Sequence, residues 1–242
     1  MNKLGKLIAV WGSEGCGKTT TAARLAVALA EQNKDVILVH TDIVAPDIPV
    51  LLPTQKEQET MGRLWNNPNC STEQILKACV TTKLNHLCLL GYKLNENVFS
   101  YSEYTKEDVY RVYTELITMA DYIMVDCVSY FMYNMLSAVA LETADKVIRM
   151  GEANLKSFSF FDSNLVLMSD RRFDMENHIR VLSKLKTYQA VELAKSKLDT
   201  QVELPYTEEL EMAMLDGKMF DKLSERKYKS GINNLVKMLE SE

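Results

Sequence analysis

The sequence predicts one α/β domain built on a doubly wound, mostly parallel β-sheet with helices on both faces. Short apolar runs alternate with segments of helical periodicity along the whole chain. Because these runs are apolar throughout, they are typical of parallel strands covered by helices on both sides. Hydrophobic residues at 47% and charged residues at 25% exclude a disordered chain. With no linker or repeat, we expect residues 1–242 to form a single domain.

The first half of the chain is expected to begin with a strand that stops at a glycine, followed by a helix rich in Ala and Leu. A second strand leads into a segment that holds three of the five prolines, which predicts a loop. A shorter helix and a strand closed by Gly91 complete this half. The expected ranges are strand 7–11, helix 19–32, strand 36–39, loop 42–53, helix 72–80 and strand 87–90.

The second half is expected to continue the alternation, with an amphipathic helix that leads into a buried strand ending at an aspartate. Two further apolar runs are expected to be strands, and the remaining periodic segments are expected to be helices. The expected ranges are helix 106–120, strands 122–125, 146–150 and 165–168, helices 175–185 and 208–215, and a helical tail from 220 onward.

Glycine is scarce in this chain and is concentrated at one place. The chain has 9 glycines, whereas average usage of about 7% predicts roughly 17. Three of them, Gly12, Gly15 and Gly17, lie within six consecutive positions. Because glycine gives the backbone unusual freedom, we expect the chemistry of the protein at this cluster.

The cluster matches the pattern G-x-x-x-x-G-K-[ST] at every fixed position. Such a loop turns its N–H groups toward phosphate, and the helix that follows adds its positive end. Lys18 is expected to reach the β- and γ-phosphates and Thr19 to bind Mg²⁺. An accidental glycine-rich turn is the competing interpretation, disfavoured by the strand before it and the helix after it. The expected nucleotide-binding residues are Gly12, Ser13, Glu14, Gly15, Cys16, Gly17, Lys18, Thr19 and Thr20.

Two aspartates that follow predicted strands are expected to complete the site with Lys18. Asp126 ends an apolar strand, which is the position of a Walker-B carboxylate that holds Mg²⁺. Asp42 ends the strand after the first helix, from where it could bind near the metal and orient the attacking water. The competing roles are a helix cap or turn for Asp126 and a loop cap for Asp42.

In the order of these parts, the chain resembles the MinD/ParA ATPases, and within them the CpaE/TadZ branch. The segment 141–148, LETADKVI, is similar to the family's "ADxVI" strand entry. The segment 204–210, LPYTEEL, followed by Asp216-Gly217-Lys218, is similar to its late "PYxxEL…GK" loop. The resemblance implies Mg-ATP as ligand, contacts of Pro205 and Tyr206 near the adenine, and an ATP-dependent homodimer.

The chain also departs from the family's pattern. Ser13 stands where the family usually has a second, signature lysine, and a serine cannot supply that charge. After the second strand, His40-Thr41-Asp42 keeps only the second acid of Asp-x-Asp. An adenine-contacting Asn expected after strand 165–168 is replaced by Ser169 or Asp170. No Pro or Gly follows Asp126 directly, so we expect slow hydrolysis or an ATP-bound state used as a switch.

The leading hypothesis is a slow, cytoplasmic ATPase that positions a plasmid, a mobile element or a pilus or secretion assembly through an unidentified cargo or adaptor protein. The alternatives are a nucleotide-sensing adaptor without useful turnover, or a kinase on a related fold. A net charge of −5 argues against wholesale DNA binding, although a local basic patch could touch DNA. The five cysteines form no Cys-x-x-Cys motif, which favours a reducing compartment. The apolar face of the tail favours packing on the protein's own core over membrane contact.

Overall fold

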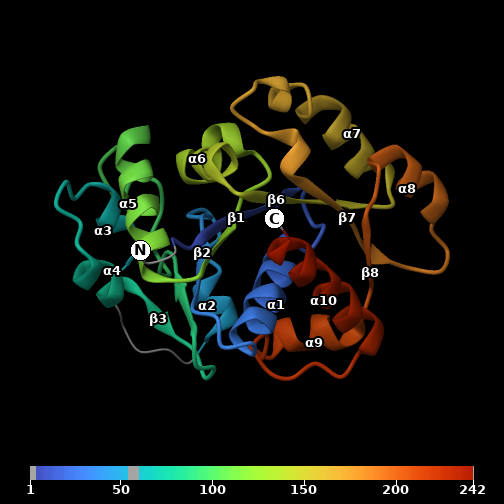
Figure 1. Cartoon of the computed structure of the whole chain (residues 1–242), viewed down its shortest axis with the longest axis horizontal. Helices are drawn as coiled ribbons and strands as arrows, with labels where there is room; N and C mark the ends of the chain where they lie inside the picture. Colours follow the sequence, from blue (N-terminus) through green and yellow to red (C-terminus); the bar gives the residue numbers. More distant parts are fainter. Residues whose placement is uncertain (1–3, 54–59, 242) are drawn as a thin grey trace.

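In the computed structural model, which describes residues 4–53 and 60–241, eight strands form one sheet in the order β3-β4-β2-β5-β1-β6-β7-β8 (Figure 1). Neighbouring strands are parallel, except for the antiparallel pair of β3 and β4. This order confirms the predicted doubly wound, mostly parallel sheet. The strands are β1 (Lys6–Gly12), β2 (Val36–His40), β3 (Val80–Thr81), β4 (Leu87–Leu90), β5 (Tyr122–Asp126), β6 (Lys146–Glu152), β7 (His178–Leu185) and β8 (Val202–Pro205).

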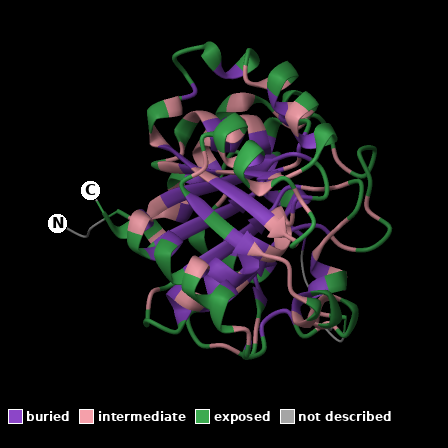
Figure 2. Ribbon diagram, turned by 90° about the vertical axis from the view of Figure 1, so that its right-hand side faces the viewer, coloured by how far each residue is buried: buried purple, intermediate pink, exposed green. Residues whose placement is uncertain are grey.

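Helices cover both faces of the sheet, and the strands between them are largely buried (Figure 2). Side chains alternate along β1, so Ile8 and Val10 enter one core whereas Ala9 and Trp11 enter the other. The first core is shared with α1, α9 and α10, and the second with α3, α4, α5 and α6. The helices are α1 (Lys18–Ala30), α2 (Ile48–Leu51), α3 (Gly62–Trp65), α4 (Thr72–Ala78), α5 (Lys106–Met119), α6 (Met135–Thr143), α7 (Leu155–Asn164), α8 (Val191–Leu198), α9 (Glu208–Leu215) and α10 (Arg226–Glu240).

The C-terminal helix α10 packs on the core of its own domain, as the sequence predicts. One of its faces holds Ile232, Leu235, Val236 and Leu239, and each of these side chains is at most 4% exposed. They join the core that α1 forms with the sheet. Because this apolar face is already covered, it is not free to bind a membrane. In the described part of the chain, no helix is both long and apolar enough to cross a bilayer.

Two predicted elements of the second half are wrong. Residues 165–168 form no strand; they follow α7 directly and enter a short 3₁₀ helix at Leu167–Ser169. Residues 175–185 form no α-helix, because a 3₁₀ turn at Met175–Asn177 leads into strand β7. The polar residues of β7 conceal its strand character, and its parallel pairing with β6 and β8 decides its conformation. The loop predicted over 42–53 contains the short helix α2.

The side chain of His178, at the start of β7, is buried, and its ring nitrogens make no hydrogen bond within the described residues. Burial, together with the charge of Arg149, lowers its pKa to about 4. Since the unfolded chain binds this proton near pH 6.5, the stabilising effect of neutral His178 is complete above that pH and is lost as the pH falls toward 4.

We therefore expect acid to destabilise the protein through His178. Between about pH 7 and pH 4, its titration should lower the free energy of unfolding by about 3 kcal/mol. Urea unfolding followed by circular dichroism across this range measures the effect. The variant His178→Phe should lose this part of the acid dependence, and the matched exposed-histidine variant His86→Gln should keep it. Equal acid dependence in wild type and His178→Phe would contradict the prediction.

Candidate nucleotide-binding site

The glycine cluster forms a tight loop between the end of β1 and the start of α1. Gly15 and Gly17 have φ angles of 77° and 81°, in the left-handed region that favours glycine. Gly12 lies against β6, where an added Cβ would come within 1.9 Å of the Met150 carbonyl oxygen. The three glycines thus serve two needs: two permit the turn, and one permits close strand packing. Lys18 and Thr19 begin the helix directly after the turn.

Cys16, within this loop, is fully buried and packs in the core with α1. Burial raises the pKa of its thiol to about 11, against the weaker opposing influence of Lys18. A thiol that stays protonated near neutral pH is a poor nucleophile. Cys16 is therefore a small packing residue of the loop.

Lys18 extends from the start of α1 toward the loop that follows β5. Its Nζ donates hydrogen bonds to Ser129 Oγ at 2.8 Å and to the Ser13 carbonyl oxygen at 3.3 Å. The Ser129 backbone is in turn fixed by Trp11, whose indole Nε1 donates to the Ser129 carbonyl oxygen at 2.9 Å. This network holds the lysine amine across the mouth of the loop.

A pocket of about 210 Å³ brings the predicted phosphate and metal residues together. The residues that line it include Lys18, Thr19, Asp42 and Asp126. The pocket forms because β1 lies beside β5, and β5 beside β2, so that their carboxyl ends meet at one edge of the sheet. A hydroxyl and carboxylates are oxygen ligands of the kind that Mg²⁺ prefers, so the donor set fits this metal.

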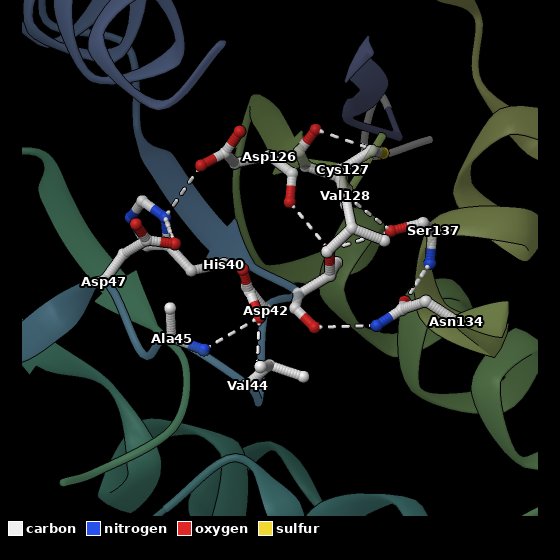
Figure 3. Close-up of polar contacts among 12 residues, drawn as sticks. His40, Asp42, Val44, Ala45, Asp47, Asp126, Cys127, Val128, Asn134 and Ser137 are labelled. Carbon is white, nitrogen blue, oxygen red and sulfur yellow. Dashed lines mark hydrogen bonds and ion pairs between the residues drawn. The ribbon is translucent and has the colours of Figure 1, made fainter. Parts of the chain in front are cut away.

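The Walker-B candidate Asp126 contacts a histidine of the neighbouring strand (Figure 3). His40 lies opposite Asp126 in the sheet, and its Nδ1 is 3.2 Å from Asp126 Oδ2 and 3.5 Å from Asp47 Oδ2. Burial alone would lower the pKa of His40, but its hydrogen bonds to the two carboxylates outweigh burial and raise this pKa to about 9. Burial raises the pKa of Asp47, which His40 partly offsets.

His40, Asp47 and Asp126 also form the group of potential metal ligands whose donor atoms lie within 4.8 Å of one another in the described structure. The sequence reasoning identified Asp126 but missed the other two as site residues. In the sequence, His40 is a departure from Asp-x-Asp, and Asp47 lies in the loop predicted over 42–53. The alignment of β2 with β5 is the signal that would have found His40.

Asp42 lies at the rim of the same pocket and shapes the loop after β2. Its Oδ1 accepts hydrogen bonds from the backbone N–H groups of Val44 at 2.8 Å and Ala45 at 3.0 Å (Figure 3). This is the loop-capping role that competed with the catalytic one. Because the carboxylate also lines the pocket, both roles are compatible with the geometry.

A second pocket, of about 230 Å³, lies on the other side of the phosphate loop. Pro205 and Tyr206, the residues expected near the adenine, line it together with Cys16, Gly17 and Thr20 of the loop and helix α1. The phosphate loop thus separates a mostly apolar pocket from the polar one that holds Lys18 and the carboxylates. Sequence reasoning missed Ser183, Lys184 and Tyr228, which also line this second pocket.

The family model of the CobQ/CobB/MinD/ParA nucleotide binding domain matches residues 7–226. The chain belongs to this family. No curated protein sequence matches it significantly.

Solved structures with the same fold include several members of the MinD and ParA groups. The cell division ATPase MinD of Pyrococcus furiosus is 18% identical, with a TM-score of 0.78 over 98% of this chain and 99% of that one. A ParA family ATPase from Chlorobium tepidum TLS is 16% identical, with a TM-score of 0.79 over 97% and 99%. MinD of Pyrococcus horikoshii OT3, complexed with Mg-ADP, is 18% identical, with a TM-score of 0.76 over 98% and 96%.

Ser13 is the phosphate-loop residue at which a departure from the family's pattern is expected. This residue is 4% exposed, and its Oγ lies 3.0 Å from Ser157 Oγ in the first turn of α7, within hydrogen-bond distance. Ser157 Oγ also accepts the backbone N–H of Glu152 at 3.0 Å. The side chain at position 13 is thus directed into the protein, where it joins the loop to α7.

The position expected for an adenine-contacting Asn, after a strand at 165–168, is wrong. Because residues 165–168 form no strand, Ser169 and Asp170 do not occupy that place; the strand beside β6 is β7, and Ser183 lies near its end. Ser183 Oγ donates to the Cys16 carbonyl oxygen at 2.6 Å and lies 3.1 Å from the Gly151 carbonyl oxygen. Ser183 therefore links β7 to the phosphate loop by a hydrogen bond, and it lines the second pocket.

Proposed function

We propose that the protein is a Mg-ATP-binding, slowly hydrolysing ATPase that acts as a nucleotide-switched positioning or partitioning protein of the MinD/ParA type. The observation that carries the proposal is the pocket that gathers Lys18, Thr19 and Asp126 beside a loop with two glycines at positive φ. This is the set that phosphate and magnesium binding requires. The apolar pocket across the loop offers a place for the adenine beside Pro205 and Tyr206.

The residues that line the site have different proposed roles in ATP hydrolysis. The loop amides from Gly12 to Thr20 and the Lys18 amine hold the phosphates, and Thr19 and Asp126 hold the metal. Mg²⁺, when bound, would neutralise negative charge that develops on the phosphate oxygens. Asp42 orients the attacking water. It is a weaker candidate than Thr19 and Asp126 for a metal ligand, since its Oδ1 already accepts hydrogen bonds from two backbone N–H groups.

Slow hydrolysis follows from the charges available at the loop. Ser13 supplies no positive charge and is directed toward Ser157 instead of the pocket. His40 occupies the position of the first acid of Asp-x-Asp, and its imidazole is hydrogen-bonded to Asp126. Fewer preorganised charges at the γ-phosphate stabilise the transition state less. The same features favour the second candidate function, a nucleotide-sensing adaptor without useful turnover.

We further propose that ATP favours a homodimer, that the cellular setting is cytoplasmic, and that a protein cargo or adaptor reads the ATP-bound state. On the quoted motifs we propose a CpaE/TadZ-like member of the family, whose cargo is a plasmid, a mobile element or a pilus or secretion assembly. DNA and membrane contacts have weaker support, because the chain carries a net charge of −5 and the apolar face of α10 is buried.

The test combines ATP turnover, recovery of intact nucleotide, and molar mass by light scattering with and without Mg-ATP. The proposal expects saturable ATP binding, slow release of phosphate and a doubled mass with ATP. Bound ATP recovered intact after long incubation, with no phosphate release, would favour the adaptor. A protein that binds no ATP would overturn both candidates.

Asp42 offers a sharper prediction, because two variants separate its two roles. In Asp42→Asn the amide oxygen can still cap the turn, but the negative charge is gone, so we expect turnover to fall about 100-fold with ATP affinity unchanged. Asp42→Ala should lose the turn as well. Phosphate release and ATP titration measure both effects. If Asp42→Asn keeps full turnover, Asp42 only shapes the loop and its catalytic role is wrong.

A further inference from the structure

A second cluster of charged side chains lies away from the nucleotide site, in a pocket of about 250 Å³. Strands β6 and β7 form its floor, and helices α7 and α8 contribute its walls. We call it the α7–α8 pocket. Its charged lining comprises three cations, Arg149, Arg180 and Lys197, and two anions, Asp162 and Asp199. Three cations less two anions leave one positive charge in excess.

The excess charge belongs to Arg149. Arg180 Nε pairs with Asp199 Oδ2 at 3.1 Å, and Lys197 Nζ pairs with Asp162 Oδ1 at 2.9 Å. For Arg149, by contrast, the described residues provide neither a hydrogen bond nor an ion pair. Its guanidinium lies 5.9 Å from the centre of the Phe161 ring, a cation–π contact that satisfies none of its N–H donors.

The position of Arg149 makes this lack of a partner costly. The residue is half-buried on an inner strand of the sheet, where an unpaired charge is expensive. In the register of the sheet it lies directly opposite Arg180, and like charges opposite each other repel. An anion between β7 and α7 would relieve both penalties.

The remaining lining limits what this anion can be. Phe161, Leu165 and Leu198 give the pocket apolar walls, so a ligand with an apolar part is favoured over a bare inorganic ion. One unpaired guanidinium balances one negative charge, and its planar fork matches a carboxylate in a bidentate pair. The volume is below the roughly 300–1,000 Å³ of pockets for drug-sized ligands, so the ligand is small.

We propose that the α7–α8 pocket binds a small monocarboxylate with an apolar substituent, which Arg149 holds through its guanidinium. The site is distinct from the pockets on either side of the phosphate loop, with which it shares none of its lining residues. It is independent of the proposed ATPase function, and its test requires no nucleotide.

The experiment uses benzoate as the probe, with benzamide as its uncharged counterpart. Saturation-transfer NMR measures binding of each compound to the full chain, for which an affinity of about 1 mM is expected from ligand size. The variant Arg149→Leu removes the charge and keeps apolar bulk, and Arg171→Leu removes an exposed arginine outside the pocket. Thermal melting of each variant reports on folding.

The proposal expects benzoate to bind wild type and Arg171→Leu alike, and Arg149→Leu at least about tenfold more weakly. Benzamide should bind wild type more weakly than benzoate by a similar factor. Arg149→Leu should melt no lower than wild type, because it removes an unpaired charge. No benzoate binding to wild type, equal binding to Arg149→Leu, or equal binding of benzamide would each overturn the proposal. Should Arg149→Leu melt at a lower temperature, Arg149→Gln replaces it in the same comparison.

Discussion

Replacing Lys18 by alanine is expected to weaken ATP binding at least about 100-fold and to abolish measurable turnover. The Lys18 amine spans the mouth of the phosphate loop, where it contacts Ser129 and the Ser13 carbonyl oxygen. Bound phosphate oxygens would replace these neutral acceptors with charged ones. Because hydrogen bonds between charged groups are stronger, this exchange contributes to the affinity for ATP. Isothermal titration with ATP and Mg²⁺ measures the loss.

A neighbouring lysine provides the matched control. Lys156 is 82% exposed at the start of α7 and lies 3.6 Å from Glu14 of the same loop, but it does not line the pocket that holds Lys18. Lys156→Ala removes an equal charge near the loop and should change ATP affinity little, since exposed ion pairs contribute little. If Lys18→Ala binds ATP as tightly as Lys156→Ala does, the phosphate-loop assignment fails.

The second large effect is expected from Gly12→Ala, which should destabilise the fold itself. A Cβ on Gly12 would lie 1.9 Å from the Met150 carbonyl oxygen and within 3 Å of two further backbone atoms of that residue. These atoms belong to β6, which is held in register with β1. Since a paired backbone cannot rotate away like a side chain, the two strands must separate locally. We expect a loss of about 3 kcal/mol or more in the free energy of unfolding.

Gly15→Ala is the matched comparison, because this glycine is needed for its conformation and not for space. Among residues 4–53 and 60–241, no atom lies within 4 Å of a Cβ added there, and the cost comes from a φ angle of 77°. Left-handed backbone costs a non-glycine residue about 1–2 kcal/mol. Urea unfolding should give a clearly lower free energy of unfolding for Gly12→Ala than for Gly15→Ala. The reverse order would show that β1 and β6 pack less closely than the structure indicates.

Much of the fold was accessible from the sequence, because most of its elements have strong local signals. The apolar runs of β1, β2, β4 and β5 and the helical periodicity of α1, α5 and α9 predicted these elements to within a few residues. The failures concern segments without such signals. β7 carries His178, Arg180 and Ser183 among its apolar residues, and its flanking strands give it the extended conformation.

The candidate site divides in the same way. The phosphate loop is contiguous in sequence, and its function requires residue types at fixed spacing, so the sequence by itself predicted all of its members. The carboxyl end of β5 likewise indicated Asp126. His40, Asp47 and Ser183 lie beside these residues only because β2 pairs with β5 and β7 with β6. No local sequence pattern predicts this order of the strands.

The glycines and Arg149 show the same limit at single residues. The sequence determined that the chain, poor in glycine elsewhere, needs backbone freedom at residues 12–17. Only the tertiary structure decided that Gly12 is required for space against Met150, whereas Gly15 and Gly17 are required for their φ angles. It also decided that Arg149 lies opposite Arg180, with no hydrogen bond or ion pair from the residues that the structure describes. The reason is that clashes and unpaired charges depend on distances between segments far apart in the chain, which only the packed sheet fixes.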